Sequence, residues 1–108
     1  MAHLTIILTT MPDDERADAL ARTLVDERLA ACVNVSGPMA STYRWKGTVE
    51  RETERQLVIK TTRARVAAVE QRLKTLHPYE LPEFLVVDVG GASSAYAEWV
   101  NSGTDANE

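Results

Sequence analysis

The stretch His77-Pro78-Tyr79-Glu80-Leu81-Pro82-Glu83, followed by the apolar run Phe84–Val89, decides how the second half of this chain folds. Each proline fixes its φ near −65° and lacks a backbone donor, so the segment cannot continue a helix or form a central strand. Residues before proline avoid the helical region, which makes His77 and Leu81 extended. We therefore predict a stiff connector between a helix and a strand. It either presents its polar side chains for function or only ends the helix.

Runs of apolar and β-branched residues predict the strands of the chain. The first run, His3 to Thr10, is stopped by Met11-Pro12. Gly37-Pro38 marks a kink or bulge further along, and Lys46-Gly47 is a credible tight turn between two strands. The predicted strands cover residues 3–10, 31–35, 41–45, 49–62 and 84–89.

Apolar residues at the i, i+3, i+4 and i+7 spacing predict amphipathic helices at residues 14–29 and 63–76, with a shorter helix at 93–101. Asp13 is the expected N-cap of the first helix, since acidic residues in the following turn suit the helix dipole. The last helix is expected to bury Tyr96, Trp99 and Val100. Residues 103–108 are polar and predict a frayed tail.

This order of elements predicts an α+β fold. The sequence β-α-β-β-α-β with an added C-terminal helix is the split βαβ pattern of ferredoxin-like folds. Right-handed crossovers place both long helices on one face of a single sheet. One such domain accounts for residues 1–108.

The first and last strands are apolar on both faces, which one layer of helices cannot cover. Ile6, Ile7 and Leu8 are consecutive in the first strand, and Phe84–Val87 are consecutive in the last. Strands of this kind are usually buried on both faces. The C-terminal helix is too short to cover a whole sheet. We therefore expect another subunit to cover the helix-free face.

Composition excludes several classes of partner and location. Twelve Lys and Arg residues against sixteen Asp and Glu give a net charge of −4, which argues against nucleic acid or an anionic membrane as the main partner. Cys32 is the only cysteine, so an internal disulfide is excluded and a reducing compartment fits best. The chain has no signal-peptide pattern and no apolar run approaching the ~20 residues that span a bilayer. The expected location is the cytoplasm.

Short motifs along the chain resemble those of a known family when they are taken together and in order. They are Ala30-Ala31-Cys32-Val33-Asn34, Tyr43-Arg44-Trp45-Lys46-Gly47, Lys60-Thr61, His77-Pro78-Tyr79 and Pro82-Glu83. From the first strand to Trp99 the chain is similar to the CutA divalent-cation tolerance family. The resemblance implies a ferredoxin-like subunit, a tight homotrimer similar in shape to PII signalling proteins, and a link to copper and other divalent cations.

The metal-ligating residues of this chain predict at most a weak site. A tight transition-metal site uses three or four ligands, commonly His or Cys, whereas His3, His77 and Cys32 show no metal-binding spacing. Some bacterial members of the resembled family carry a cysteine late in the first strand and a second histidine before Pro-Tyr; here those positions are Thr9 and Leu76. In a trimer, a groove between subunits could still combine His77 of one chain with side chains of the next. We therefore expect weak binding of copper or another divalent cation, with His77 as the metal residue.

Each other candidate has a structural and a functional interpretation. His77 itself could instead lock the connector through a hydrogen bond to the backbone or to Glu83. A buried cysteine is usually inert, which favours a core position for Cys32. Lys60 either pairs with a glutamate or forms a solvated strand end. The run at 50–54, in which acidic residues alternate, is most typical of a solvated face.

The aromatic residues of the hairpin and of the last helix favour packing or docking. Tyr43 and Trp45 share one face of a strand, and the Lys46-Gly47 turn places Glu50 opposite Tyr43. The candidate groove or interface residues are Cys32, Tyr43, Trp45, Glu50, Lys60, Tyr79, Glu83 and Trp99.

Two functional hypotheses follow. An acid–base pair of His77 with Glu80 or Glu83 is conceivable, but the chain has no nucleophile elbow, phosphate-binding glycine loop or zincin motif, so we assign no catalytic residue and expect no enzyme. The first hypothesis is a homotrimeric protein of divalent-cation (copper) binding and tolerance, with weak metal sites in the grooves between subunits. The alternative is a PII-like signalling or scaffold trimer that binds a small molecule or a partner protein.

Overall fold

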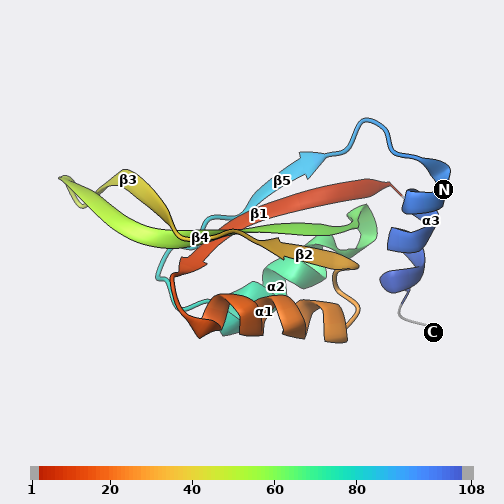
Figure 1. Ribbon diagram of the computed structural model, residues 1–108, viewed down its shortest axis with the longest axis horizontal. Helices are drawn as coiled ribbons and strands as arrows, with labels where there is room; N and C mark the ends of the chain where they lie inside the picture. Colours follow the sequence, from red (N-terminus) through yellow and green to blue (C-terminus); the bar gives the residue numbers. More distant parts are fainter. Residues whose placement is uncertain (1–2, 106–108) are drawn as a thin grey trace.

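The computed structural model describes residues 3–105, which form one antiparallel sheet with two long helices against one of its faces (Figure 1). The sheet has five strands in the order β2-β4-β1-β5, with β3 paired to β4 beyond that path. This is the ferredoxin-like arrangement that the order of elements predicts. The elements are β1 (Leu4–Pro12), α1 (Glu15–Asp26), β2 (Cys32–Val35), β3 (Met39–Trp45), β4 (Thr48–Thr62), the 3-10 turn η1 (Arg63–Arg65), α2 (Val66–Leu76), β5 (Leu85–Asp88) and α3 (Ser94–Gly103).

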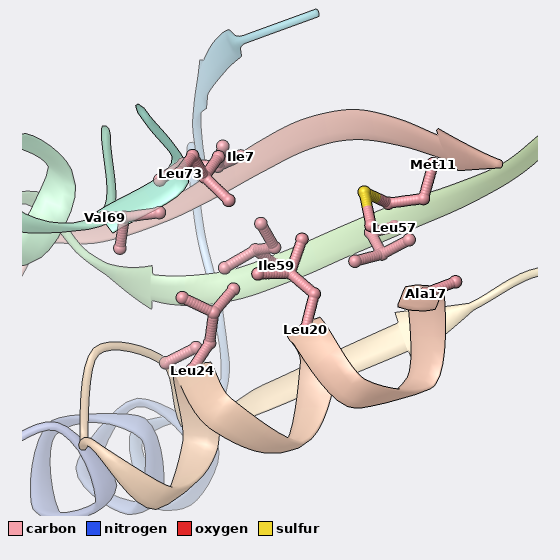
Figure 2. Packing of buried hydrophobic residues seen from close by; sticks show 10 residues of the cluster. Ile7, Met11, Ala17, Leu20, Leu24, Leu57, Ile59, Val69 and Leu73 are labelled. Carbon is pink, nitrogen blue, oxygen red and sulfur yellow. The ribbon is translucent and has the colours of Figure 1, made fainter. Parts of the chain in front are cut away.

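The core lies between the sheet and the two long helices. Leu20 and Leu24 of α1 point towards Ile59 of β4, and Val69 and Leu73 of α2 pack in the same cluster (Figure 2). All of these side chains are buried. Fully burying a Leu or Ile side chain contributes about 1.5–3 kcal/mol, so this layer is the main source of the subunit's stability.

The start of α1 differs from the prediction by one residue. Asp14, not Asp13, is the N-cap: its Oδ1 accepts a hydrogen bond of 2.9 Å from the backbone N–H of Arg16. Asp13 instead pairs with Arg55 at 2.8 Å. The difference arises because β1 continues through Pro12, whose register partner is Glu54, rather than stopping at Thr10.

Other boundaries differ by a few residues. The helix α1 ends at Asp26 rather than at 29, and Arg28 then adopts a left-handed φ of 60°. The helix α2 begins after η1, and β5 is shorter than the apolar run that predicts it. At the C-terminus α3 reaches Gly103 and Thr104 is buried, so order extends beyond the predicted start of the tail. Residues 106–108 lie outside the described part of the chain.

The hairpin of β3 and β4 projects beyond the end of β1 (Figure 1). Its turn is Lys46-Gly47, as predicted, between the paired residues Trp45 and Thr48. Both turn residues have positive φ, 50° and 83°, as a two-residue turn matching the strand twist requires. The kink at Gly37-Pro38 separates β2 from β3, also as predicted.

The helix-free face of the sheet carries apolar side chains that the subunit leaves partly in solvent. In register, Ile6 lies beside Val87, and Leu8 lies beside Leu85. The side chains of Leu85 and Val87 are 52% and 45% exposed. The subunit therefore has an apolar surface with no cover of its own over these strands.

The last helix covers little of this face and does not bury its aromatic residues as predicted. Val100 is buried, but Tyr96 and Trp99 are 40% and 52% exposed, with their rings stacked on each other 5.5 Å apart. The reason is that α3 docks through its small residues: a Cβ at Gly103 would lie 3.1 Å from the Cβ of Ala31. No helix within residues 3–105 is long and apolar enough to cross a membrane.

Candidate functional site

A groove runs between the projecting hairpin and the proline connector. It is open to solvent and has a volume of about 1020 Å³. The end of β1, both strands of the hairpin and the connector all contribute to its wall. The lining residues are Thr10, Pro12, Met39, Ser41, Thr42, Tyr43, Arg44, Trp45, Glu52, Thr53, Glu54, Gln56, Pro78, Tyr79, Glu80, Leu81, Pro82 and Glu83.

His77 is held at the start of the connector by both of its ring nitrogens. Nε2 lies 2.8 Å from the carbonyl oxygen of Thr10, which can only accept, so Nε2 carries the proton. Nδ1 accepts a hydrogen bond of 3.2 Å from the backbone N–H of Tyr79. Burial lowers the pKa of His77, and the bond to Thr10 and the charge of Glu54 oppose part of that shift. The imidazole is therefore neutral at pH 7 and fastens the connector to β1.

Tyr79 links the connector to β4. Its hydroxyl donates a hydrogen bond of 2.8 Å to Oε2 of Glu54, and its ring lies 4.9 Å from that of His77. Burial and the bond to Glu54 raise the pKa of Tyr79 far above its usual range, so it remains a donor at any physiological pH. Glu54 is only 8% exposed, which corrects the expectation that the whole acidic run 50–54 is solvated. Its burial is possible because the connector crosses here and supplies the Tyr79 donor.

Glu83 brings a second carboxyl group into the same wall. Its Oε2 is buried and has no hydrogen-bond partner among the described residues. Burial raises the pKa of Glu83, and the charge of Glu54 raises it further. A buried acceptor without a donor costs about 1–3 kcal/mol. Glu83 therefore occupies a position that a bound donor or cation would stabilise.

The outer part of the groove is aromatic. Tyr43 is opposite Glu50, as predicted, and its pKa is raised by burial and by the charges of Glu52, Glu54 and Glu50. Trp45 is half-buried, and the Nζ of Lys46 lies 5.6 Å from the centre of its ring. Tyr43, Trp45, Tyr79 and Glu83 thus meet in one groove, whereas Glu50 lies on β4 outside the groove lining.

The remaining predicted residues lie elsewhere. Cys32 pairs in register with Lys60, which in turn lies beside Ile6, so both are on the helix-free face. Cys32 is only partly buried and is not part of the core cluster, which corrects the expectation of a core position. Trp99 lies on the exposed side of α3.

The described residues of the subunit form no metal-binding cluster. Residues 3–105 contain no group of three or more His, Cys, Asp or Glu side chains that could hold a metal ion. Cys32 and His77 are matched to Ile6 and Thr10 of β1, four residues apart, which corresponds to roughly 13 Å along the strand. A His–Cys copper site within one chain does not fit this geometry.

Sequence reasoning missed the central role of Glu54 and the contribution of Thr10. Glu54 alternates with Glu52 in a run that looks uniformly solvated. Its burial depends on where β1 ends and where the connector crosses, since Pro12 is its register partner. Only the strand register carries that information, and no local motif does.

Comparison with known proteins identifies relatives that extend over most of the chain. Residues 5–103 match the family model described as CutA1 divalent ion tolerance protein. A divalent-cation tolerance protein CutA from Pectobacterium atrosepticum is 42% identical over 102 residues, covering 94% of this chain and 93% of the relative. The protein of the same name from Thermus thermophilus is 38% identical over 99 residues, covering 92% and 96%.

Solved structures give the same result. The crystal structure of CutA from Xylella fastidiosa superposes with a TM-score of 0.92 at 43% identity, covering 96% of this chain and all of that one. CutA from Synechococcus elongatus superposes with a TM-score of 0.92 at 42% identity, covering 97% and 93%. With this fold, this groove and these relatives, the chain belongs to the CutA1 divalent ion tolerance protein family.

Proposed function

We propose that this protein is a homotrimer that binds divalent cations, copper among them, at weak sites in the grooves between subunits, and so confers cation tolerance. The observation that carries the proposal is the pair of carboxyl groups, Glu54 and Glu83, in the groove between the hairpin and the connector. We expect a neighbouring subunit to complete this groove. Oε2 of Glu83 is buried without a donor, close enough to Glu54 for that charge to raise its pKa. A divalent cation would supply the missing positive charge to both groups.

Weak binding is expected because the subunit offers an incomplete ligand set. Carboxylate oxygens suit hard cations better than copper. His77, the residue that the sequence nominates for copper, must first give up its bond to Thr10 or to the N–H of Tyr79. A neighbouring subunit would have to add the remaining ligands.

The helix-free face supports assembly. Its exposed apolar side chains, Leu85 and Val87 among them, are the kind that a partner normally covers. The number three comes from the resemblance in sequence and not from the subunit itself. Sedimentation equilibrium at micromolar concentration tests it; a well-folded monomer there would contradict assembly.

Copper titration tests the metal site. We expect wild type to bind Cu²⁺ in the micromolar range or more weakly, with affinity falling as the pH drops and ligands are protonated. Both Glu83→Gln and His77→Ala should weaken it, and Glu98→Gln, which removes an exposed carboxyl group on α3 outside the groove lining, is the matched control. If His77→Ala binds copper as well as wild type, His77 only locks the connector. If Glu83→Gln has no effect either, the groove is not the metal site.

A second candidate function is a PII-like signalling or scaffold role in which the groove binds a small molecule or partner protein. The observation that favours it is the groove itself. Its volume of about 1020 Å³ is at the upper end of the range for small-molecule sites, and part of its wall is aromatic. A thermal-shift screen of nucleotides, organic anions and metals separates the two functions. A selective shift by Cu²⁺ favours the first, and a shift by an organic compound favours the second.

In either form we propose a binding role rather than catalysis, in the cytoplasm. The single cysteine, Cys32, supports this location because it suits a reducing compartment. Relatives include proteins described as chloroplastic and one described as periplasmic. Cell fractionation with an antibody to the protein decides the location.

A further inference from the structure

A small pocket lies beside α3, at the end of the sheet opposite the hairpin (Figure 1). Its wall combines the start of β1, the end of β4, the loop before α3 and α3 itself. Leu4, Ile6, Val89 and Val100 are among its apolar lining residues. Its volume is about 220 Å³, below the ~300–1,000 Å³ of small-molecule sites. The pocket therefore suits one large side chain better than a ligand.

Lys60 is the one charged residue of this lining among the residues that the structure describes. In register it lies between Ile6 of β1 and Cys32 of β2, on the helix-free face. Within residues 3–105, no carboxylate forms an ion pair with Lys60. When a second subunit covers this face, the ammonium group loses its water, and a buried charge without a partner is costly. The covering surface must therefore bring a carboxyl group to Lys60.

The hairpin carries a carboxyl group next to an aromatic side chain. Tyr43 is paired with Glu50, and Trp45 follows Tyr43 by two residues, so Trp45 and Glu50 are diagonal neighbours on one face of the hairpin. Both side chains are only partly buried, and Glu50 forms no ion pair within residues 3–105. This face therefore matches the pocket in size and Lys60 in charge.

The two surfaces are placed for a contact between opposite ends of two copies. The hairpin projects from one end of a subunit that is 45 Å long, and the pocket lies at the other end (Figure 1). A subunit therefore cannot place its own hairpin in its own pocket. Head-to-tail contacts of this kind form closed rings when the rotation between copies allows it.

We propose that this pocket receives the hairpin of a second copy of the chain, with Trp45 of that copy in the pocket and its Glu50 paired with Lys60. The inference rests on the homotrimer of the proposed function and names the residues on both sides of its contact. It also chooses between the two interpretations of Lys60 that the sequence leaves open, in favour of a pair with a glutamate.

Charge reversal tests the pair by sedimentation equilibrium of the full chain. Lys60→Glu and Glu50→Lys each bring like charges together, so each should weaken association about tenfold per contact, or about 1.4 kcal/mol. The double variant restores an opposite pair and should recover most of that loss. The matched control combines Lys60→Glu with Glu98→Lys, which reverses an exposed carboxyl group of α3 outside the pocket lining and should recover nothing.

Circular dichroism checks that each variant folds. Where a charge-reversed variant fails to fold, Lys60→Met and Glu50→Gln replace the pair: each alone leaves one charge unpaired, and the double variant should associate more tightly than either. The inference is overturned if the single variants associate as wild type does, if the double variant gains nothing over them, or if the Glu98→Lys control recovers as much. A wild-type protein that stays monomeric overturns the proposed trimer as well, whereas an assembled wild type without charge rescue overturns this inference alone.

Discussion

The two ends of the sheet differ in how completely the subunit buries their side chains. Under β1 and β4, the helices α1 and α2 bury every apolar side chain that faces them. Past the end of β1, the hairpin and connector instead expose aromatic rings and bury a carboxyl oxygen that has no donor. The first region is complete within one subunit. The second is stable only because the first anchors it, which is the usual relation between a scaffold and a binding site.

The largest expected effect on stability comes from a substitution in the core between the helices and the sheet, the end that is complete within one subunit. Leu24→Ala removes a fully buried side chain between α1 and β4 and should lower the free energy of unfolding by about 2–5 kcal/mol. The matched control is Val49→Ala in the hairpin, where the side chain is 60% exposed and the change should be within about 0.5 kcal/mol. Urea denaturation measures both. Equal losses would mean that the hairpin is as tightly packed as the core.

The next effect should appear in assembly rather than in folding. Trp45 is half-buried in the free subunit, and the Nζ of Lys46 in the same hairpin lies 5.6 Å from the centre of its ring. If neighbouring subunits complete this end, Trp45→Ala should weaken association by about 2 kcal/mol, as expected for an aromatic anchor, and leave the circular dichroism spectrum unchanged. Sedimentation equilibrium supplies the association constant. Loss of helical signal with the oligomer intact would place Trp45 in the subunit core.

A smaller effect tests the link between the two ends. Tyr79→Phe removes the donor to Glu54 and leaves that buried carboxylate with one bond fewer, so stability should fall by about 1–2 kcal/mol. Tyr96→Phe, on the exposed side of α3, is the control and should be neutral. Thermal melts at one protein concentration compare them. A neutral Tyr79→Phe would show that water replaces the lost donor.

The smallest effect has the opposite sign. Because burial raises the pKa of Glu83, the folded state holds that proton more tightly than the unfolded chain, and ionised Glu83 lowers stability at pH 7. Glu83→Gln should therefore stabilise the protein at pH 7, by up to about 1 kcal/mol, and the gain should vanish as the pH falls below the ordinary carboxyl value of 4.5. Stability measured from pH 4 to 8 checks this. A gain that is constant with pH would rule out the ionisation of Glu83 as its cause.

The end of the sheet that is complete within one subunit is also the part that the sequence predicts best. Leu20 and Leu24 follow a helical period, Lys46-Gly47 has the chemistry of a hairpin turn, and Pro78 ends a helix, so local rules suffice for these elements. The groove depends on registers and crossings that join distant residues. His77 and Tyr79 were named from the sequence, but their partners Thr10 and Glu54 were not.

The errors in prediction share this cause. Tyr96 and Trp99 have the spacing of a buried stripe, yet α3 docks by the close approach of Gly103 to Ala31 and leaves them outside. Cysteine is a residue type that is usually buried in the core, yet Cys32 occupies a position of β2 that faces the helix-free side of the sheet. A hydrophobic period says which residues share a face but not which face is covered.

Because β4 runs without a break through both ends of the sheet, the number of residues between them decides which face each side chain takes. β4 is continuous over its 15 residues, with Leu57 and Ile59 facing the helices and Glu54 and Gln56 lining the groove. Since successive side chains of a strand alternate, one residue inserted between Glu54 and Leu57 would turn the whole arm over relative to the core. An insertion of two would move the arm along by about 7 Å and keep every face. In this part of β4, only insertions or deletions of an even number of residues therefore keep the side chains of the hairpin on their present faces.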